Sequence, residues 1–283
     1  MLLDGKRALV TGGVRGIGRR VAEKLLERRA VVGILDINRD ALDALVAERR
    51  EVWGRTCDVT RSGEVAEAVA AFRSERGEID VLVNCATIAG GGWLGESSEQ
   101  QSDAVLAVTL KGTMNTCTHA LIAMIKQGTG RIINFTSPSW LGVAGADAYT
   151  AAKGGVVSLT RGIASRMKLE GHKITCNAIA PIARTRLNQD AAPMWDALYK
   201  AGVIDRQLYE DSVNPASPEE IPPIVCYLAT DQAENINGRV FGATRGRIAL
   251  YSDPQEIRGI YKDGIWTLEE LVKLMPRTLA RGL

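Results

Sequence analysis

Apolar residues gather in short runs separated by longer amphipathic segments. The runs are rich in β-branched residues and occupy residues 7–11, 31–36, 52–57, 81–84, 131–136 and 174–180, with a last strand expected at 238–243. Most of the segments between them are long enough for a helix. Such alternation predicts an α/β fold in which helices cover both faces of a parallel sheet.

The segment between the first two expected strands shows how a crossover helix would pack. Val21, Leu25 and Leu26 recur at helical spacing, and charged side chains fill the remaining positions. This pattern predicts an amphipathic helix. Its length fits a right-handed βαβ unit.

Residues 185–223 depart from the alternation. The stretch is polar and punctuated by prolines, yet it carries the apolar residues Met194, Trp195 and Tyr199. We expect either a lid over a substrate site or an ordinary surface connection whose aromatic residues pack on the core.

The chain continues well beyond the last expected strand. In this tail Thr267 and Glu270 form a capping box, which predicts a short helix that ends at Pro276. We expect one domain over residues 1–245 and a C-terminal extension over residues 246–283. The extension would cover the active site or dock on a neighbouring subunit.

Composition narrows the range of partners. Hydrophobic residues make up 46% and charged residues 24% of the 283 residues, which is ordinary for a globular protein. A formal net charge of +2 creates no strong positive electrostatic field that would hold a polyanion such as nucleic acid. We therefore expect a small-molecule substrate and no nucleic-acid partner. We also expect no membrane partner and a cytoplasmic location, because no apolar run is long enough to span a bilayer and no secretory leader is visible. Five scattered cysteines and two distant histidines predict no metal site.

A glycine-rich turn, TGGVRGIG at residues 11–18, joins the first strand to the amphipathic helix. Glycines let the backbone approach a pyrophosphate, whose charge is met by free N–H groups at the helix N-terminus. Asp36 ends the second strand, where a carboxylate can bind the ribose hydroxyls of a dinucleotide and would repel a 2′-phosphate. Arg15 could instead bind a 2′-phosphate. Like-charge repulsion at contact distance is hard to offset, so NAD is expected in preference to NADP.

Tyr149 and Lys153 are four residues apart, which places a phenol and an ammonium on one helical face. A free tyrosine has a pKa near ~10. A cation ~4 Å away, at an effective dielectric of about 20, stabilises the phenolate by roughly 4 kcal/mol, or about three pK units. We therefore expect Tyr149 to exchange a proton near neutral pH.

The order of these motifs resembles that of the short-chain dehydrogenase/reductase family. The motifs that carry the resemblance are the turn at 11–18, Asp58-Val59, Asn84-Cys85-Ala86, the Ser137 region, Tyr149 with Lys153, and Asn177-Ala178-Ile179-Ala180-Pro181. They span roughly residues 5–245. The resemblance implies a single doubly wound Rossmann-type domain with a seven-stranded parallel sheet, a nicotinamide cofactor, and a homodimer or homotetramer.

The resemblance also implies roles for individual residues. Tyr149 is the general acid/base, Lys153 lowers its pKa and holds the nicotinamide ribose, and Ser137 binds the substrate oxygen. The implied catalytic set is thus Ser137, Tyr149 and Lys153. Asp58 and Val59 would contact the adenine, and Thr185 the carboxamide. The expected cofactor-binding residues are Gly12, Arg15, Gly16, Ile17, Gly18, Asp36, Asp58, Val59, Asn84, Ala86, Tyr149, Lys153, Pro181 and Thr185.

Several positions differ from the family pattern. Thr109 stands where an asparagine usually completes a proton relay, and its hydroxyl is a possible substitute. Thr87 and Ile182 stand where glycine is usual, which puts β-branched bulk beside the cofactor. Ser137 precedes Tyr149 by one residue fewer than is common, which leaves Ser139 and Thr136 as alternatives to it.

The sequence supports two hypotheses of function. The first is an NAD-dependent oxidoreductase that moves a hydride between nicotinamide and a secondary alcohol or ketone. Its substrate would be a hydrophobic cyclic or acyl compound, in a pocket shaped by some of Trp93, Trp140, Leu141, Met194, Trp195 and Tyr199. The alternative is a nucleotide-binding regulator or scaffold of the same fold with little or no turnover.

Overall fold

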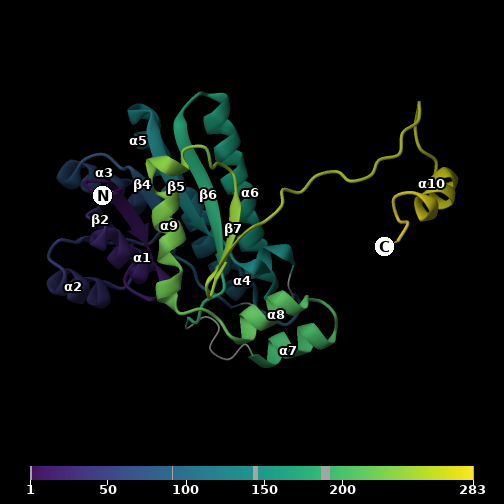
Figure 1. The fold of residues 1–283 in the computed structure, drawn as a ribbon, viewed down its shortest axis with the longest axis horizontal. Coiled ribbons are helices and arrows are strands. Elements are labelled where there is room, and N and C mark those ends of the chain that lie inside the picture. Colours follow the sequence, from purple (N-terminus) through teal and green to yellow (C-terminus); the bar gives the residue numbers. More distant parts are fainter. Residues whose placement is uncertain (1, 91, 143–145, 186–191, 283) are drawn as a thin grey trace. The chain divides into compact units, whose positions relative to one another are not determined.

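The computed structural model describes residues 2–90, 92–142, 146–185 and 192–282, and within them the chain forms one sheet of eight strands (Figure 1). The strands are β1 (Arg7–Thr11), β2 (Val31–Asp36), β3 (Trp53–Thr56), β4 (Val81–Asn84), β5 (Thr129–Phe135), β6 (Lys173–Pro181), β7 (Val240–Thr244) and β8 (Arg247–Leu250). Their order is β3-β2-β1-β4-β5-β6-β7-β8. The strand order therefore reverses at β1, as in a doubly wound sheet.

Helices cover both faces of this sheet (Figure 1). The main helices of this part of the chain are α1 (Gly16–Glu27), α2 (Arg39–Glu48), α3 (Ser62–Arg76), α4 (Glu99–Leu106), α5 (Gly112–Gln127), α6 (Asp147–Leu169), α7 (Ala192–Lys200), α8 (Arg206–Val213) and α9 (Pro222–Leu228). Alternate residues of β1 point to opposite faces: Ala8 and Val10 pack in one core with α1, α2 and α9, and Leu9 in another with α3, α5 and α6. The predicted Rossmann-type α/β fold is confirmed. No helix of the described residues is long and apolar enough to cross a membrane.

The sheet differs from the expected seven parallel strands at one edge. Strands β1 to β7 pair in parallel, but β8 pairs antiparallel with β7. A tight turn joins the two, and Gly246 in it has a φ of +59°, which favours glycine. A single glycine between two short runs is a weak hairpin signal, so the sequence did not reveal β8.

The chain divides into two compact units, Met1–Tyr251 and Ser252–Leu283. The boundary expected after residue 245 falls in the turn between β7 and β8. In the second unit, α10 (Leu268–Leu274) begins at the predicted capping box, in which the Thr267 hydroxyl accepts from the Glu270 amide and the Glu270 carboxylate accepts from the Thr267 amide. Lys262 also binds the Glu270 carboxylate, at 2.6 Å.

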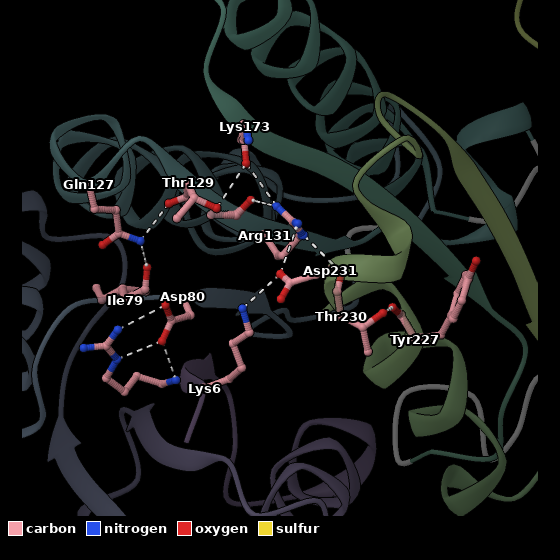
Figure 2. Close-up of polar contacts among 12 residues, drawn as sticks. Lys6, Ile79, Asp80, Gln127, Thr129, Arg131, Lys173, Tyr227, Thr230 and Asp231 are labelled. Atoms are coloured by element: carbon pink, nitrogen blue, oxygen red, sulfur yellow. Dashed lines mark hydrogen bonds and ion pairs between the residues drawn. The ribbon is translucent and has the colours of Figure 1, made fainter. Parts of the chain in front are cut away.

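A polar network lies at the edge where the parallel strands begin (Figure 2). Arg131 of β5 is only 5% exposed. Its guanidinium donates to the carbonyls of Lys173 at 3.0 Å and Thr230 at 3.2 Å, and lies 3.4 Å from the Asp231 carboxylate. The same carboxylate accepts from Lys6 at 2.9 Å. This network joins the segment before β1 to the starts of β5 and β6 and the end of α9.

Candidate active site

A cavity of about 890 Å³ lies where the carboxyl ends of the parallel strands meet. Ligands of open α/β sheets bind at this edge, and the volume is within the range of small-molecule sites. Most of the predicted site residues line it: Gly12, Arg15, Gly16, Ile17, Gly18, Asp36, Asp58, Val59, Ala86, Ser137, Tyr149, Lys153, Pro181 and Thr185. The structure thus brings together residues that are far apart in the sequence.

The turn between β1 and α1 is built for close backbone approach. Gly12 has a φ of +66°, and a Cβ there would lie 2.8 Å from the Ala86 backbone. A Cβ on Gly18 would lie 2.2 Å from the Gly12 carbonyl oxygen. In the described chain no side chain caps the N-terminus of α1, whose first turn carries no acidic residue. Its free N–H groups fit the pyrophosphate of a dinucleotide.

Asp36 ends β2 beside this turn. Its carboxylate accepts from the Asn38 amide at 3.0 Å and from the Val14 amide at 3.3 Å. The side chain therefore supports the glycine-rich turn and places a negative charge in the cavity wall.

The Asp58-Val59 pair follows β3 and is held from two sides. The Nδ2 of Asn115 donates to the Val59 carbonyl at 2.8 Å. The Val59 side chain lies against Gly112, where a Cβ would be 2.6 Å from Val59 Cγ2. The Asp58 carboxylate accepts from the amide and hydroxyl of Thr60 at 2.9 and 2.8 Å. These contacts fix this part of the cavity wall.

Asn84 is the predicted site residue that the structure places elsewhere. It is 3% exposed and is absent from the cavity lining. Its amide donates to Asn134 Oδ1 at 2.9 Å, and its carbonyl oxygen accepts from Thr116 at 2.7 Å. The structure thus places the Asn84 side chain in the core and not in the described cavity wall. Its polar groups are used inside the core, where they link β4 to β5 and α5.

Three candidate hydroxyls follow β5, those of Thr136, Ser137 and Ser139, and they differ in their hydrogen-bond partners. Thr136 lines the cavity, but its hydroxyl donates to the carbonyl of Lys153 at 2.9 Å and so ties the end of β5 to α6. Ser137 accepts from the Ser139 amide at 3.2 Å and donates to the Ser139 hydroxyl at 3.1 Å. A hydrogen bond also joins Ser137 to the Tyr149 phenol. Ser137 is thus both a turn cap and the hydroxyl that meets Tyr149.

Tyr149 and Lys153 lie on α6 as their spacing predicts. The Lys153 Nζ is 5.4 Å from the centroid of the Tyr149 ring and donates to the Phe135 carbonyl at 2.7 Å. Burial lowers the pKa of Lys153 to about 7. Burial raises the pKa of Tyr149 to about 12, although the hydrogen bond with Ser137 acts in the opposite direction.

The expectation that Lys153 lowers the pKa of Tyr149 toward neutrality is therefore wrong for the protein without bound cofactor. Desolvation of Tyr149 outweighs any attraction to Lys153, whose own charge is weakened by burial. At neutral pH Tyr149 is a protonated hydrogen-bond donor.

The stretch 185–223 contributes only part of the predicted substrate pocket. Met194 and Trp195 from α7 and Ser212 from α8 line the cavity, whereas residues 186–191 lie outside the described residues. Trp140 packs edge to face on Tyr251, at 5.5 Å between ring centroids. Neither Trp93, Leu141 nor Tyr199 is among the described lining residues.

Sequence reasoning missed further residues of the wall, and no local pattern marks them. They include Asn38, Cys57, Cys85, Ile88, Val108 and Ser212. Thr109, the possible relay substitute, is 1% exposed and does not line the described cavity, although its neighbour Val108 does.

Comparisons with known proteins agree with this geometry. A profile of the short chain dehydrogenase family matches residues 6–194. The short-chain reductase protein NovJ of Streptomyces niveus is 38% identical over 252 residues, which cover 85% of this chain and 93% of that protein. The crystal structure of a short chain dehydrogenase from Mycobacterium avium matches with a TM-score of 0.82 at 29% identity, over 99% of this chain and 96% of that one. The actinorhodin polyketide ketoreductase, solved with NADPH, matches with a TM-score of 0.72 at 30% identity, over 84% and 95%. The chain therefore belongs to the short-chain dehydrogenase/reductase family, oxidoreductases that use NAD(P)H and act on CH–OH groups of small molecules.

Proposed function

We propose that the protein is an NAD-dependent oxidoreductase that interconverts a secondary alcohol and its ketone, with Tyr149 as general acid/base. One observation carries this proposal. Ser137, Tyr149 and Lys153 line the same cavity as the glycine-rich turn after β1 and Asp36. The residues that would hold the pyrophosphate of a dinucleotide therefore share one cavity with the Tyr149 phenol.

The protein groups have separate tasks in this reaction. The bound nicotinamide supplies or accepts the hydride. The Tyr149 phenol, which burial keeps protonated at neutral pH, donates its proton to the substrate oxygen, and the Ser137 hydroxyl binds the same oxygen. Lys153, when protonated, stabilises the phenolate left after proton transfer. The raised phenol pKa suits the reductive direction at neutral pH.

The preference for NAD over NADP rests on Asp36. Its carboxylate is held in the cavity wall by the amides of Val14 and Asn38, so it is not free to turn away from a ribose. A 2′-phosphate would meet this charge. Comparing kcat/KM for NADH and NADPH tests the preference. Asp36→Asn should reduce it, because the amide removes the charge and keeps the shape.

The proposed substrate is an uncharged, hydrophobic cyclic or acyl compound. The apolar residues Val108, Ile182, Met194 and Trp195 are part of the cavity wall. Such a wall favours apolar surface. A cytoplasmic homodimer or homotetramer remains a prediction from the family resemblance.

The experiment follows oxidation of NADH by the full-length protein with a panel of hydrophobic ketones. We expect turnover by the wild type, and a loss of about 100- to 10,000-fold in kcat for Tyr149→Phe while the variant still binds NADH. Tyr227→Phe is the matched control, since Tyr227 lies on α9, 42% exposed. Unchanged turnover by Tyr149→Phe would remove the assigned acid/base. NADH binding without turnover of any ketone would favour a nucleotide-binding regulator.

A further inference from the structure

We infer that the hydroxyls of Thr87 and Thr109 form a clasp that positions the cavity wall after β4, and so sets the affinity for the dinucleotide. This inference rests on the proposed function of the cavity. The clasp is defined as the pair of hydroxyl groups of Thr87 and Thr109 together with the Ile88 carbonyl oxygen that both approach.

Thr109 lies in a π-helical turn, Ala107–Lys111, between α4 and α5. It is 1% exposed, and a buried hydroxyl requires a hydrogen-bond partner. Its Oγ1 lies 3.0 Å from the Thr87 Oγ1 and donates to the Ile88 carbonyl at 3.4 Å. A π-helical turn is often found at functional sites, and here it directs Thr109 toward the segment after β4.

That segment forms a continuous part of the cavity wall. Its lining residues are Cys85, Ala86, Thr87, Ile88, Ala89 and Gly90. The start of the segment is held by β1, since the amide of Cys85 donates to the Thr11 carbonyl and the amide of Ala86 to the Thr11 hydroxyl, both at 3.2 Å. Beyond Ala86, the hydrogen bonds described from residues 87–90 to other parts of the chain go to Thr109.

The two hydroxyls depend on each other. Thr87 Oγ1 also lies 3.5 Å from the Ile88 carbonyl, so either hydroxyl can donate to the other while the second donates to that carbonyl. Glycine at position 87 would leave Thr109 with only the long contact to Ile88. Valine at position 109 would leave Thr87 in the same state.

The clasp explains two departures from the family pattern together. Because Thr109 does not line the described cavity, it acts through the segment it holds and is a positioning residue rather than a proton carrier. Thr87 lines the cavity, so its hydrogen bond with Thr109 fixes the position of this part of the wall.

The test is a titration of the full-length protein with NADH, followed by fluorescence, for Thr87→Val, Thr109→Val and the double variant. Each single variant should raise the Kd about 2- to 10-fold, the range for one neutral hydrogen bond. The double variant should raise it no further, because either change already breaks the pair. Thr109→Ser keeps the hydroxyl and should restore affinity. Thr118→Val is the control, since the Thr118 hydroxyl donates to the Met114 carbonyl on the exposed side of α5.

Steady-state kinetics with any ketone that is reduced separates positioning from proton transfer. We expect the KM for NADH to rise while kcat stays within about twofold. A fall in kcat with unchanged KM, or an altered pH profile of kcat, would show that Thr109 carries protons and would overturn the clasp. Additive effects of Thr87→Val and Thr109→Val on Kd, or no effect of either, would also overturn it. Thr87→Ser and Thr109→Ser keep the hydroxyl and should bind NADH as the wild type does; a Kd raised equally in them would mean that the loss comes from packing and not from the hydrogen bonds. If wild-type protein bound no NADH, the proposed function would fail first, and this inference with it.

Discussion

Two buried cations, Arg131 and Lys153, lie near opposite ends of strand β5. Arg131 is 5% and Lys153 2% exposed. The Arg131 guanidinium is enclosed by carbonyl oxygens of Gly130, Lys173 and Thr230 and approaches the Asp231 carboxylate (Figure 2). Lys153 donates to one carbonyl, that of Phe135, and burial lowers its pKa to about 7.

The two side chains are similarly buried, but their different chemistry gives them different roles at the two edges of the sheet. A guanidinium keeps its charge and offers five donors in a rigid plane, so several fixed acceptors can surround it. At the amino edge this arrangement holds strand starts together. The Lys153 ammonium, whose pKa burial lowers to about 7, can gain or lose its proton near neutral pH, which suits a group that assists proton transfer.

The residues around the two cations differ in the same way. At the amino edge Arg7 binds the Asp80 carboxylate with two nitrogens, at 2.8 and 3.2 Å. At the carboxyl edge the chain instead supplies glycines, free helix amides and a cavity. We conclude that interactions for stability gather at one edge, while polar groups at the other stay available to a ligand.

The largest expected effect comes from removing the ammonium at the carboxyl edge. Lys153→Met keeps the length of the side chain but cannot stabilise a phenolate, so kcat should fall by at least about 100-fold. The measurement is NADH oxidation with the ketone that the wild type reduces. Lys173→Met is the control because the Lys173 side chain is exposed at the start of β6. Turnover within about threefold of the wild type would contradict the conclusion that Lys153 serves catalysis while Arg131 serves stability.

The second prediction concerns the amino edge. Arg131→Met removes the donor that the carbonyls of Gly130, Lys173 and Thr230 share and leaves the Asp231 carboxylate to Lys6, so the free energy of unfolding should fall by about 3 kcal/mol. For a chain of this length the Tm should drop by roughly 6–12 °C, while the Kd for NADH stays within about twofold. Arg166→Met, which loses an exposed pair with Glu170, should change the Tm little. An unchanged Tm for Arg131→Met, or NADH binding lost while the variant is folded, would break the comparison.

The sequence predicts the parallel sheet well because both signals it uses are local. Runs of β-branched residues mark β1 to β7, and the glycine-rich turn and Asp36 belong to strand ends that must meet at one edge. Strand β8 was missed because its turn contains only Gly246 as a signal. Asn84 was misplaced because the sequence shows that a residue ends a strand but not whether its side chain turns into the core or the cavity.

The phenol pKa shows a different kind of limit. The spacing of Tyr149 and Lys153 correctly places both on one helical face, and a Coulomb argument from that spacing predicts an acidic phenol. The sequence contains no measure of desolvation, which reverses the sign for Tyr149 and removes much of the charge on Lys153. Burial is a property of the whole fold, so electrostatic predictions from spacing alone fail at buried sites.

The smallest expected effect is a pH dependence of stability at Lys153. Its pKa falls from 10.5 in the unfolded chain to about 7 in the fold, so the folded state binds fewer protons than the unfolded state between these values. The contribution of Lys153 to stability therefore improves as pH rises through this window, by about 1 kcal/mol from pH 7 to pH 8. Lys153→Met lacks this dependence. Thermal unfolding of both proteins without cofactor should thus show the variant gaining most over the wild type at pH 7, with the gap in Tm narrowing by roughly 2–4 °C at pH 8. Other titrating groups are shared by the two proteins and cancel in the difference. A gap that stays constant or widens with pH would mean that burial does not lower the pKa of the Lys153 ammonium into this range.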